Sequence, residues 1–399
     1  MIINNASIIG QGYVGLPLSM HLTKIGIKVN GIDTNQNTVD SLNRGISSIE
    51  DVASSDVLLA KNNGLYQATC SFEKISESDV VIICVPTPLN DYHLPDLSYL
   101  NSALTELSKF VKPGSLIILE STVAPGTTRS LVVAAIENGT LSSIDNFFLV
   151  FSPERIDPRN KKWNISNTPK LVAGLTDKCC ELGYQFYSKF IDDVVKCNSL
   201  EVAETAKLLE NSFRLINISF INELSIFCEK IGVDINDVVK AAATKPYGYM
   251  PFYPSIGVGG HCIPVDPIYL SSRAKELGVP TKFLDLATQI NSEMPRYFVE
   301  KAREKLGELN NRNILVIGVA YKPNVADVRE TAAFELIKGL RNGGANVDWH
   351  DDLVKEWNSE KSVELSSNYD LAIIAAQHDH IDLSRLGTVP LIRAGEKIN

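Results

Sequence analysis

Three glycines between an apolar run and a helical pattern restrict the fold of this chain most strongly. Gly10, Gly12 and Gly15 form a G-x-G-x-x-G motif, and Asp33 closes the next apolar run 18 residues after Gly15. That order predicts a strand, a glycine turn, a helix and a second strand, which form a βαβ unit. The glycines let a pyrophosphate approach the helix N-terminus, and the acid accepts ribose hydroxyls. The unit predicts dinucleotide binding with NAD favoured over NADP, and a glycine turn in an unrelated α/β fold is the alternative.

The α/β rhythm appears at both ends of the chain, with a helical middle. The expected strands lie at residues 79–85, 115–119, 147–151, 313–320, 345–350 and 369–376. Between these two groups, residues 199–231 lack Gly and Pro and keep apolar residues at helical spacing, which predicts one long helix. We therefore predict an α/β fold in which two Rossmann-like parallel-sheet domains are joined by a central helical domain. The predicted domains are residues 1–197, 198–306 and 307–399.

The charge balance excludes several classes of partner. Lys and Arg total 38 against 47 Asp and Glu, so a net charge of −9 offers no global attraction to nucleic acid or an anionic membrane. The N-terminus does not read as a signal peptide, and no run approaches the roughly 18 apolar residues of a membrane span. We expect a cytoplasmic protein. The seven cysteines are scattered without a CxxC pair, so neither a disulfide framework nor a metal site is expected.

Polar residues follow three of the expected strands at their carboxyl ends, where ligands bind in open α/β sheets. These residues are Thr87 after Val85, Ser121 and Thr122 after the next strand, and Glu154 and Arg155 after the third. Each hydroxyl taken alone is more typical of a turn or cap, and Glu154 with Arg155 is more typical of a surface ion pair.

Two further segments carry candidate chemistry. In the long helix, Glu204, Lys207 and Asn211 share one face, and a solvated polar face is the alternative. In YMPFYPSIGVGGHCIPVDPIYL, the glycines before Cys262 indicate backbone pressed against a ligand, and a displayed thiol suits nucleophilic catalysis. His261 has no second His/Cys cluster to complete a zinc site, and a packed structural cysteine is the stronger alternative.

Seven motifs then occur together and in order: GQGYVGLP, VPTP, ESTVAPGTT, SPER, AETAKLLENSFR, GVGGHCIPVDP and YKPNVADVRET. With them the chain resembles the UDP-glucose/UDP-N-acetylhexosamine 6-dehydrogenase family over roughly residues 6–376. The resemblance implies an NAD-dependent four-electron oxidation of the C6 alcohol of a UDP-sugar to a UDP-uronic acid, a precursor of surface polysaccharide. It implies that Cys262 carries the intermediate as a thiohemiacetal and then as a thioester.

The resemblance also implies roles for individual residues. Lys207 and Asn211 match residues that polarise the substrate oxygen, Glu154 matches the acid that assists thioester hydrolysis, and Thr122 and Asp266 match a pair that handles protons and a water. The implied cofactor contacts are Gly10, Gly12, Tyr13, Val14, Gly15, Asp33, Val85, Thr87, Ser121, Thr122 and Arg329. The implied UDP-sugar contacts are Glu154, Arg155, Lys207, Asn211, Tyr253, Gly259 and Lys322.

Assembly and substrate follow from the same resemblance. It implies a homodimer built on the long helix and a C-terminal UDP-sugar-binding domain. His261 before the cysteine and SPER in the acid loop resemble the UDP-N-acetylhexosamine branch, and the segment YMPFYPSIGVGGHC resembles UDP-N-acetylglucosamine enzymes within it. UDP-N-acetylmannosamine and UDP-glucose are the alternatives. Two rivals remain, a two-electron hydroxy-acid dehydrogenase and a catalytically silent nucleotide-sugar or NAD sensor. Two departures are Thr38, where some relatives are basic, and the short unfamiliar chain after Ala376.

Overall fold

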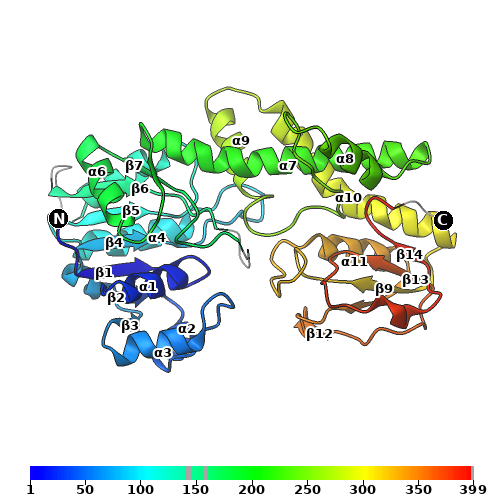
Figure 1. Cartoon of the computed structure of the whole chain (residues 1–399), viewed down its shortest axis with the longest axis horizontal. Helices are drawn as coiled ribbons and strands as arrows, with labels where there is room; N and C mark the ends of the chain where they lie inside the picture. Colours follow the sequence, from blue (N-terminus) through cyan, green and yellow to red (C-terminus); the bar gives the residue numbers. More distant parts are fainter. Residues whose placement is uncertain (140–145, 157–159, 161, 397–399) are drawn as a thin grey trace. The chain divides into compact units, whose positions relative to one another are not determined.

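The fold is described from a computed structural model, which covers residues 1–139, 146–156, 160 and 162–396 (Figure 1). Residues 140–145, 157–159, 161 and 397–399, which belong to the predicted first and third domains, lie outside the described residues. The chain divides into two compact units, Met1–Leu209 and Glu210–Asn399. The predicted boundaries after residues 197 and 306 stay predictions.

The first unit is built on an eight-stranded sheet in the order β3-β2-β1-β4-β5-β6-β7-β8. The strands are β1 Asn5–Ile9, β2 Lys28–Ile32, β3 Tyr66–Thr69, β4 Val80–Ile83, β5 Leu116–Leu119, β6 Phe148–Phe151, β7 Lys170–Gly174 and β8 Val194–Lys196. Neighbouring strands are parallel except β6 and β7, which pair antiparallel. The two strands predicted around the glycine turn are β1 and β2, and the three predicted after them are β4, β5 and β6. The strands β3, β7 and β8 extend the sheet beyond the prediction.

Helices cover both faces of this sheet because its strands are apolar on both sides. The helices are α1 Gly15–Lys24, α2 Gln36–Asn43, α3 Ser54–Asn62, α4 Ser98–Phe110, α5 Val133–Glu137 and α6 Asp177–Tyr187. Ile8 and Ile82 face a core formed with α1, α3 and α6, whereas Ile9 and Ile83 face a second core formed with α4 and α5. Continuous burial of four-residue runs such as VVII is typical of parallel sheets covered on both faces.

The predicted long helix is α7, Leu200–Lys230, and the division between the two units falls inside it. The second unit continues with four helices and a smaller sheet. Its helices are α8 Ile235–Ala243, α9 Asp266–Glu276, α10 Lys282–Leu306 and α11 Ala332–Asn342. Its parallel sheet has the order β10-β9-β13-β14, formed by β9 Asn313–Ile317, β10 Asn346–His350, β13 Leu371–Ile374 and β14 Leu391–Ile392. A small hairpin, β11 Glu356–Trp357 and β12 Glu360–Lys361, follows β10. The predicted fold class is confirmed.

The second sheet repeats the local geometry of the first. Gly10 and Gly318, at φ of 92° and 81°, each follow the first strand of a β-turn-α-β unit. The Gly10 N–H donates to the Ile32 carbonyl at 2.8 Å, and the Gly318 N–H donates to the His350 carbonyl at 2.8 Å. In each case an aspartate follows the second strand, Asp33 in one unit and Asp351 in the other.

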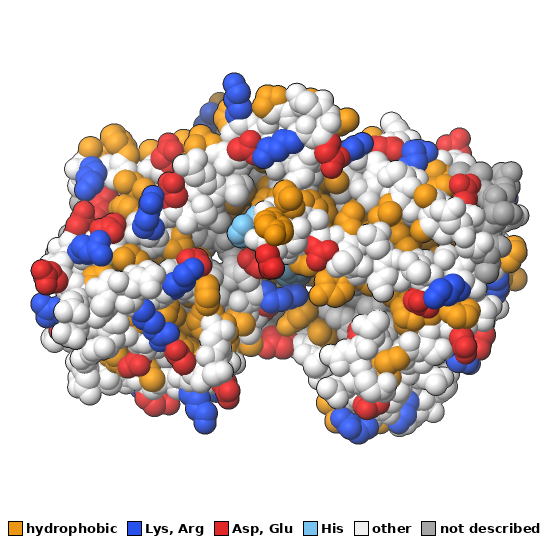
Figure 2. Space-filling model, turned by 180° about the vertical axis from the view of Figure 1, so that it is seen from behind, with side chains coloured by type: hydrophobic (Ala, Val, Ile, Leu, Met, Phe, Trp, Pro, Cys, Tyr) orange, Lys and Arg blue, Asp and Glu red, His pale blue; other side chains and the backbone are white. Residues whose placement is uncertain are grey.

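Charged side chains of both signs are intermingled on the face drawn in Figure 2. Several of the chain's exposed ion pairs join residues three apart on one helix, as Lys109 with Glu106 and Arg303 with Glu300 do. The described residues of this face therefore present no extended strip of positive charge of the kind that tracks a phosphate backbone. Within the described part of the chain, no helix is long and apolar enough to cross a bilayer.

Candidate active site

The glycine motif lies at the switch point of the first sheet, between β1 and β4. The space around a Cβ differs from one glycine of the motif to the next. A Cβ on Gly10 would lie 2.6 Å from the Cys84 carbonyl oxygen, and one on Gly15 would lie 1.8 Å from the Gly10 carbonyl oxygen. Close backbone approach therefore requires both. Gly12 instead has no heavy atom within 4 Å of such a Cβ, so the turn is open there. Open space beside a helix N-terminus is what a pyrophosphate needs.

Asp33 lies beside this glycine turn and is bound to it. Its Oδ2 accepts the Gln11 N–H and its Oδ1 accepts the Asn35 N–H, both at 2.9 Å, and the side chain is half-buried. A carboxylate oxygen has more than one acceptor position, so these two bonds leave capacity for ribose hydroxyls. The first turn of α1, which begins after Val14, contains no acidic residue to repel a phosphate. The residues present fit a dinucleotide.

The predicted hydroxyls lie along the same edge, after β4 and β5. Thr87 and Thr122 are half-buried. Ser121 is buried, and its hydroxyl donates to the Val85 carbonyl at 2.8 Å. This bond joins the two loops, as the turn-hydroxyl alternative expects.

The polar residues of α7 are buried, so the alternative of a solvated polar face is wrong. Glu204, Lys207 and Asn211 are all buried. Glu204 accepts the N–H groups of Gly126 at 2.6 Å and Thr128 at 2.8 Å. Burial raises the pKa of Glu204, and these N–H groups offset part of the rise. Glu204 therefore fixes the loop that follows Thr122.

Glu154, which is half-buried, belongs to a group that we name the Lys170 cluster, in which Glu120, Lys170 and Tyr187 are buried. The Lys170 Nζ lies 3.1 Å from Oε2 of Glu120 and 3.1 Å from Oε2 of Glu154. The Tyr187 hydroxyl donates to Oε1 of Glu120. The other Glu154 oxygen, Oε1, accepts two backbone N–H groups, from Arg155 and Ile156, each at 2.7 Å. The carboxylate of Glu154 is held at both oxygens, so the surface ion pair expected from SPER is wrong for Glu154.

The two carboxyl groups of the cluster differ in pKa. Burial raises the pKa of Glu120, and the charge of Lys170 opposes the rise only in part. Burial also acts to raise the pKa of Glu154, but Lys170 and the two backbone N–H groups outweigh it and lower the pKa. Burial acts to lower the pKa of Lys170, but the two carboxylates outweigh it and raise the pKa. Lys170 thus keeps Glu154 ionised, whereas Glu120 ionises less readily.

In the second unit, Cys262 is joined to two of the predicted reaction residues. The Cys262 carbonyl accepts the N–H of Asp266, the first residue of α9, at 2.8 Å. The Oδ2 of Asp266 in turn accepts the side-chain amide of Asn211 at 2.6 Å. Cys262 is half-buried and Asp266 is buried. Lys207 lies one helical turn before Asn211 on the same face of α7.

The glycines before Cys262 contact the chain itself. A Cβ on Gly260, at φ of 85°, would lie 2.8 Å from the ring of Tyr321, and one on Gly259 would lie 2.5 Å from the Glu330 carbonyl oxygen. The Gly260 N–H also donates to the Arg329 carbonyl at 3.1 Å. Protein atoms therefore already require these glycines, and their contact with a ligand stays a prediction. They seat the Cys262 loop on the loop that follows β9.

The remaining predicted contacts are more exposed. Arg329 is exposed, and its guanidinium donates to Asp327 at 2.9 and 3.0 Å. Burial acts to raise the pKa of Asp327, but these bonds and the Arg329 charge outweigh it and lower the pKa. Lys322 is half-buried with its Nζ 5.7 Å from the Tyr321 ring centre, and Tyr253 is exposed. Among the described residues, no group of three or more His, Cys, Asp or Glu is arranged to hold a metal ion.

Several buried residues were missed by sequence reasoning. Glu120 lies inside the ESTVAPGTT motif directly after β5, but Lys170 and Tyr187 approach it from distant segments without any local pattern. Asp351 carries a detectable signal, since it follows the second strand of a βαβ unit as Asp33 does.

Comparison with known proteins identifies the chain's relatives. Three domains of the UDP-glucose/GDP-mannose dehydrogenase family match it: the NAD binding domain at residues 4–191, the central domain at 201–293 and the UDP binding domain at 315–391. The chain is 34% identical over 354 residues to UDP-N-acetyl-D-glucosamine 6-dehydrogenase from Pseudomonas aeruginosa, covering 87% of this chain and 82% of that protein. It is also 34% identical over 352 residues to UDP-N-acetyl-D-mannosamine dehydrogenase from Campylobacter jejuni, covering 86% and 85%.

Solved structures agree with these matches. The UDP-glucose dehydrogenase of Pyrobaculum islandicum superposes with a TM-score of 0.90 at 26% identity, covering 100% of this chain and 96% of that one. The UDP-D-ManNAc dehydrogenase of Pyrococcus horikoshii gives 0.88 at 29% identity, covering 98% and 93%. The predicted NAD-dependent oxidoreductase is confirmed, and the chain belongs to the UDP-glucose/GDP-mannose dehydrogenase family.

Proposed function

We propose that this protein oxidises the C6 alcohol of a UDP-N-acetylhexosamine, first UDP-N-acetylglucosamine, to the carboxylate through a thioester on Cys262. The observation that best supports this is the position of Cys262 beside a buried polar pair: its backbone carbonyl accepts the Asp266 N–H, and the Asp266 carboxylate accepts the side-chain amide of Asn211. In this proposal residues 1–197 bind NAD, residues 198–306 carry the reaction residues, and residues 307–399 bind the UDP-sugar.

The turn from Gly10 to Gly15 and Asp33 would hold NAD⁺, which when bound would supply the oxidant for two successive removals of a hydride from C6. After the first oxidation, the Cys262 thiolate adds to the C6 aldehyde and forms a thiohemiacetal; the second oxidation converts it to a thioester. Lys207 and Asn211 stabilise the negative oxygen in these additions, since donors aimed at a developing oxyanion lower the barrier. Water then cleaves the C–S bond, which frees the carboxylate and returns the proton to the thiol. Asp266 and Thr122 hold the water and the protons for these steps.

Glu154 assists the hydrolysis as a carboxylate. Its ionised form is supported by the Lys170 ammonium 3.1 Å away and by two backbone N–H groups at 2.7 Å. A base that deprotonates or orients water must be unprotonated at the working pH. Lys170 is therefore the group that keeps Glu154 in the form required for the last step.

The choice of substrate rests on the sequence around Cys262 and on the relatives. The named relatives include enzymes for both UDP-N-acetylglucosamine and UDP-N-acetylmannosamine at 34% identity, so identity supports an N-acetylhexosamine without ranking the two. His261 and the residues leading to Cys262 favour the glucosamine substrate. The sensor alternative has no support in the comparisons, because the named relatives quoted above are dehydrogenases. Counting NADH formed per UDP-sugar separates the four-electron enzyme from a two-electron one.

We also propose a homodimer in which α7 packs against α7 of a second copy. Six large apolar side chains along this helix are each 46–61% exposed: Val202, Leu209, Phe213, Phe220, Phe227 and Ile231. At about 100° per residue they fall within about 20° of one line, opposite the buried Glu204, Lys207 and Asn211. A two-fold axis brings the same surface of both subunits together, so a straight apolar stripe can pack against the same stripe of a second copy. An exposed apolar stripe of this kind therefore favours a second copy of this chain as its partner.

For Cys262→Ala we expect loss of uronic acid formation with UDP-sugar and NAD⁺ binding kept, because the thiol is needed for the covalent steps and adds little to ground-state affinity. Mass spectrometry of wild-type protein quenched during turnover should show a sugar adduct on the peptide that contains Cys262. The control Cys197→Ala should retain activity. An adduct on another cysteine would contradict the assignment.

The substrate assignment predicts the highest kcat/KM for UDP-N-acetylglucosamine in a panel with UDP-N-acetylmannosamine, UDP-N-acetylgalactosamine and UDP-glucose. A pocket that hydrogen-bonds the acetamido group leaves its own polar groups unpaired with UDP-glucose, and such discrimination reaches roughly 10⁴-fold. Absorbance of NADH and product mass measure rate and identity together. A preference for UDP-glucose would sink the N-acetylhexosamine assignment and leave the Cys262 mechanism standing.

For Lys170→Met we expect a loss of about 3–5 kcal/mol of unfolding free energy near neutral pH, because the buried Glu120 and the half-buried Glu154 lose their shared counter-charge. In the wild type, the lowered pKa of Glu154 gives stability that is present above its unfolded pKa and is lost as pH falls through the folded value. In the variant, burial raises the pKa of both carboxyls, so the folded state takes up protons more readily.

The difference in unfolding free energy between wild type and Lys170→Met should therefore narrow as pH falls from about 8 to about 5, as measured by urea unfolding at several pH values. Lys109→Met, which breaks only an exposed pair with Glu106, should cost less than about 0.5 kcal/mol at every pH. A Lys170→Met difference that does not change with pH would mean that the two carboxyls do not depend on Lys170 for their charge.

The dimer proposal predicts that Phe220→Glu, in the middle of the stripe, yields a monomer in sedimentation velocity at micromolar concentration. A charge placed between two apolar helices loses its solvation without gaining a partner. Arg214→Glu makes a charge change of the same kind on an exposed position about 120° away from the stripe, and should remain dimeric. A Phe220→Glu variant that sediments like the wild type would rule out this interface.

A further inference from the structure

The aspartates that follow β2 and β10 occupy equivalent places but have different partners. Asp33 accepts the N–H of Gln11, the residue after Gly10, and Asp351 accepts the N–H of Val319, the residue after Gly318, both at 2.9 Å. Each also accepts the backbone N–H of the residue two positions later in the chain, Asn35 for Asp33 and Leu353 for Asp351, again at 2.9 Å. Up to this point the two units repeat one arrangement.

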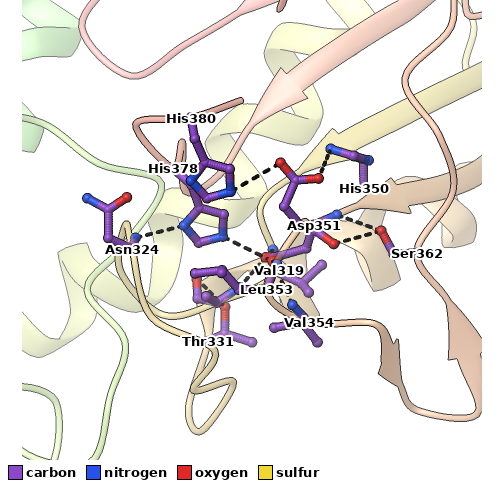
Figure 3. A network of polar contacts seen from close by, with 12 residues as sticks. Val319, Asn324, Thr331, His350, Asp351, Leu353, Val354, Ser362, His378 and His380 are labelled. Atoms are coloured by element: carbon purple, nitrogen blue, oxygen red, sulfur yellow. Dashed lines mark hydrogen bonds and ion pairs between the residues drawn. The ribbon is translucent and has the colours of Figure 1, made fainter. Parts of the chain in front are cut away.

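Asp351 then differs from Asp33 by having further donors. It accepts the N–H of Ala320 at 3.3 Å, the N–H of Val354 at 2.9 Å and the ring Nε2 of His378 at 3.0 Å (Figure 3). Asp351 and His378 are both fully buried, whereas Asp33 is half-buried. Asp351 is surrounded by protein donors. The carboxylate that accepts ribose hydroxyls in a dinucleotide-binding fold thus accepts hydrogen bonds from the protein itself here.

His378 connects this carboxylate to the far end of the loop after β9. Its Nδ1 accepts the backbone N–H of Asn324 at 2.7 Å, which means that the ring proton is on Nε2 and is donated to Asp351. Asn324 has a φ of 64°, a conformation that needs support in a residue with a side chain. The side chain of Asn324 makes two hydrogen bonds to Asp379. Its Nδ2 donates to the Asp379 carboxylate at 2.9 Å, and its Oδ1 accepts the Asp379 backbone N–H at 3.0 Å.

The loop from Val319 to Asn324 is therefore anchored at both ends by one hydrogen-bonded chain. Asp351 holds the first two N–H groups and His378 holds the last one. Lys322, the implied UDP-sugar contact, lies between these anchors, and Tyr321, on which Gly260 is seated, lies beside it. Figure 3 shows Asn324, His378 and Asp351 arranged in this order.

We propose that His378 and Asp351 are positioning residues for UDP binding, which hold the Val319–Asn324 loop so that Lys322 reaches the UDP moiety. This inference rests on the proposed function for the role of Lys322. His378 touches no ligand itself and acts through the Asn324 N–H. A neutral ring that donates on one side and accepts on the other is required, because the two partners are a carboxylate and an N–H group.

Two substitutions of His378 separate the two hydrogen bonds. His378→Asn places an amide oxygen near the position of Nδ1 and keeps the bond to Asn324, whereas His378→Gln places an amide nitrogen near Nε2 and keeps only the bond to Asp351. The matched control is His380→Gln. His380 is exposed, stacks on His378 with ring centres 5.8 Å apart and pairs with Asp352 at 3.2 Å.

The experiment measures UDP affinity of the full chain by calorimetry, with NAD⁺ affinity as the check on folding. His378→Gln should weaken UDP binding roughly tenfold, His378→Asn by no more than about threefold, and His380→Gln should not change it. Lys322→Met should weaken UDP binding by itself. Adding His378→Gln to Lys322→Met should cause little further loss, because one acts through the other.

Unchanged UDP affinity in His378→Gln, or a full additional loss in the double variant, would overturn the inference while leaving the proposed function intact. Unchanged affinity in Lys322→Met would remove the role of Lys322 from the proposed function, and this inference with it. If His378→Gln does not fold, Asp379→Ala removes the exposed support of Asn324 instead. That variant should weaken UDP binding in the same direction and be non-additive with Lys322→Met, and wild-type affinity in it would overturn the inference.

Discussion

A single backbone constraint recurs in both units, namely a glycine turn held by a carboxylate at the end of the neighbouring strand. Parallel strands bring the turn after the first strand against the end of the second, where the glycine N–H meets a strand carbonyl at 2.8 Å in both cases. The next N–H along the turn then points at the aspartate. The two aspartates differ in exposure: Asp33 is half-buried, whereas Asp351 is fully buried among further donors. Only Asp33 is therefore accessible to the ribose of a ligand bound at its turn.

The long helix serves two purposes on its two sides. Its buried side holds Glu204, which fixes the loop after Thr122, and Lys207 and Asn211, which we propose take part in the reaction. Its other side carries the exposed apolar stripe for which we propose a second copy. The buried side mixes these polar residues with apolar ones such as Leu208 and Leu215, and the exposed side carries large apolar residues. Both features depart from the usual amphipathic pattern, and both are expected if the buried polar residues belong to a site and the exposed stripe to an interface.

Buried charge is placed where the proposed chemistry needs a definite protonation state. Lys170 is shared between two carboxylates, and the pKa of Glu154 falls while that of Glu120 rises. The proposed nucleophile is positioned by its backbone and not by buried charge. Cys262 is attached through its backbone to Asp266, and its preceding glycines are pressed against Tyr321 and Glu330. Backbone packing thus sets the position of Cys262, whereas the partly buried ion pairs with Lys170 set the protonation of Glu120 and Glu154.

By itself the sequence determined the α/β class, the long helix, the dinucleotide turn and most of the residues proposed for the reaction. These are local signals, because hydrophobic period, glycine spacing and motif order are written in consecutive residues. Only the tertiary structure decided which polar residues are buried and with whom. Lys170 meets Glu120 from 50 residues away, and His378 meets Asp351 from 27 residues away, so no local pattern announces either pair. The structure also decided that the glycines before Cys262 face protein atoms, because a close approach leaves the same glycine signature whether its partner is a ligand or another loop of the chain.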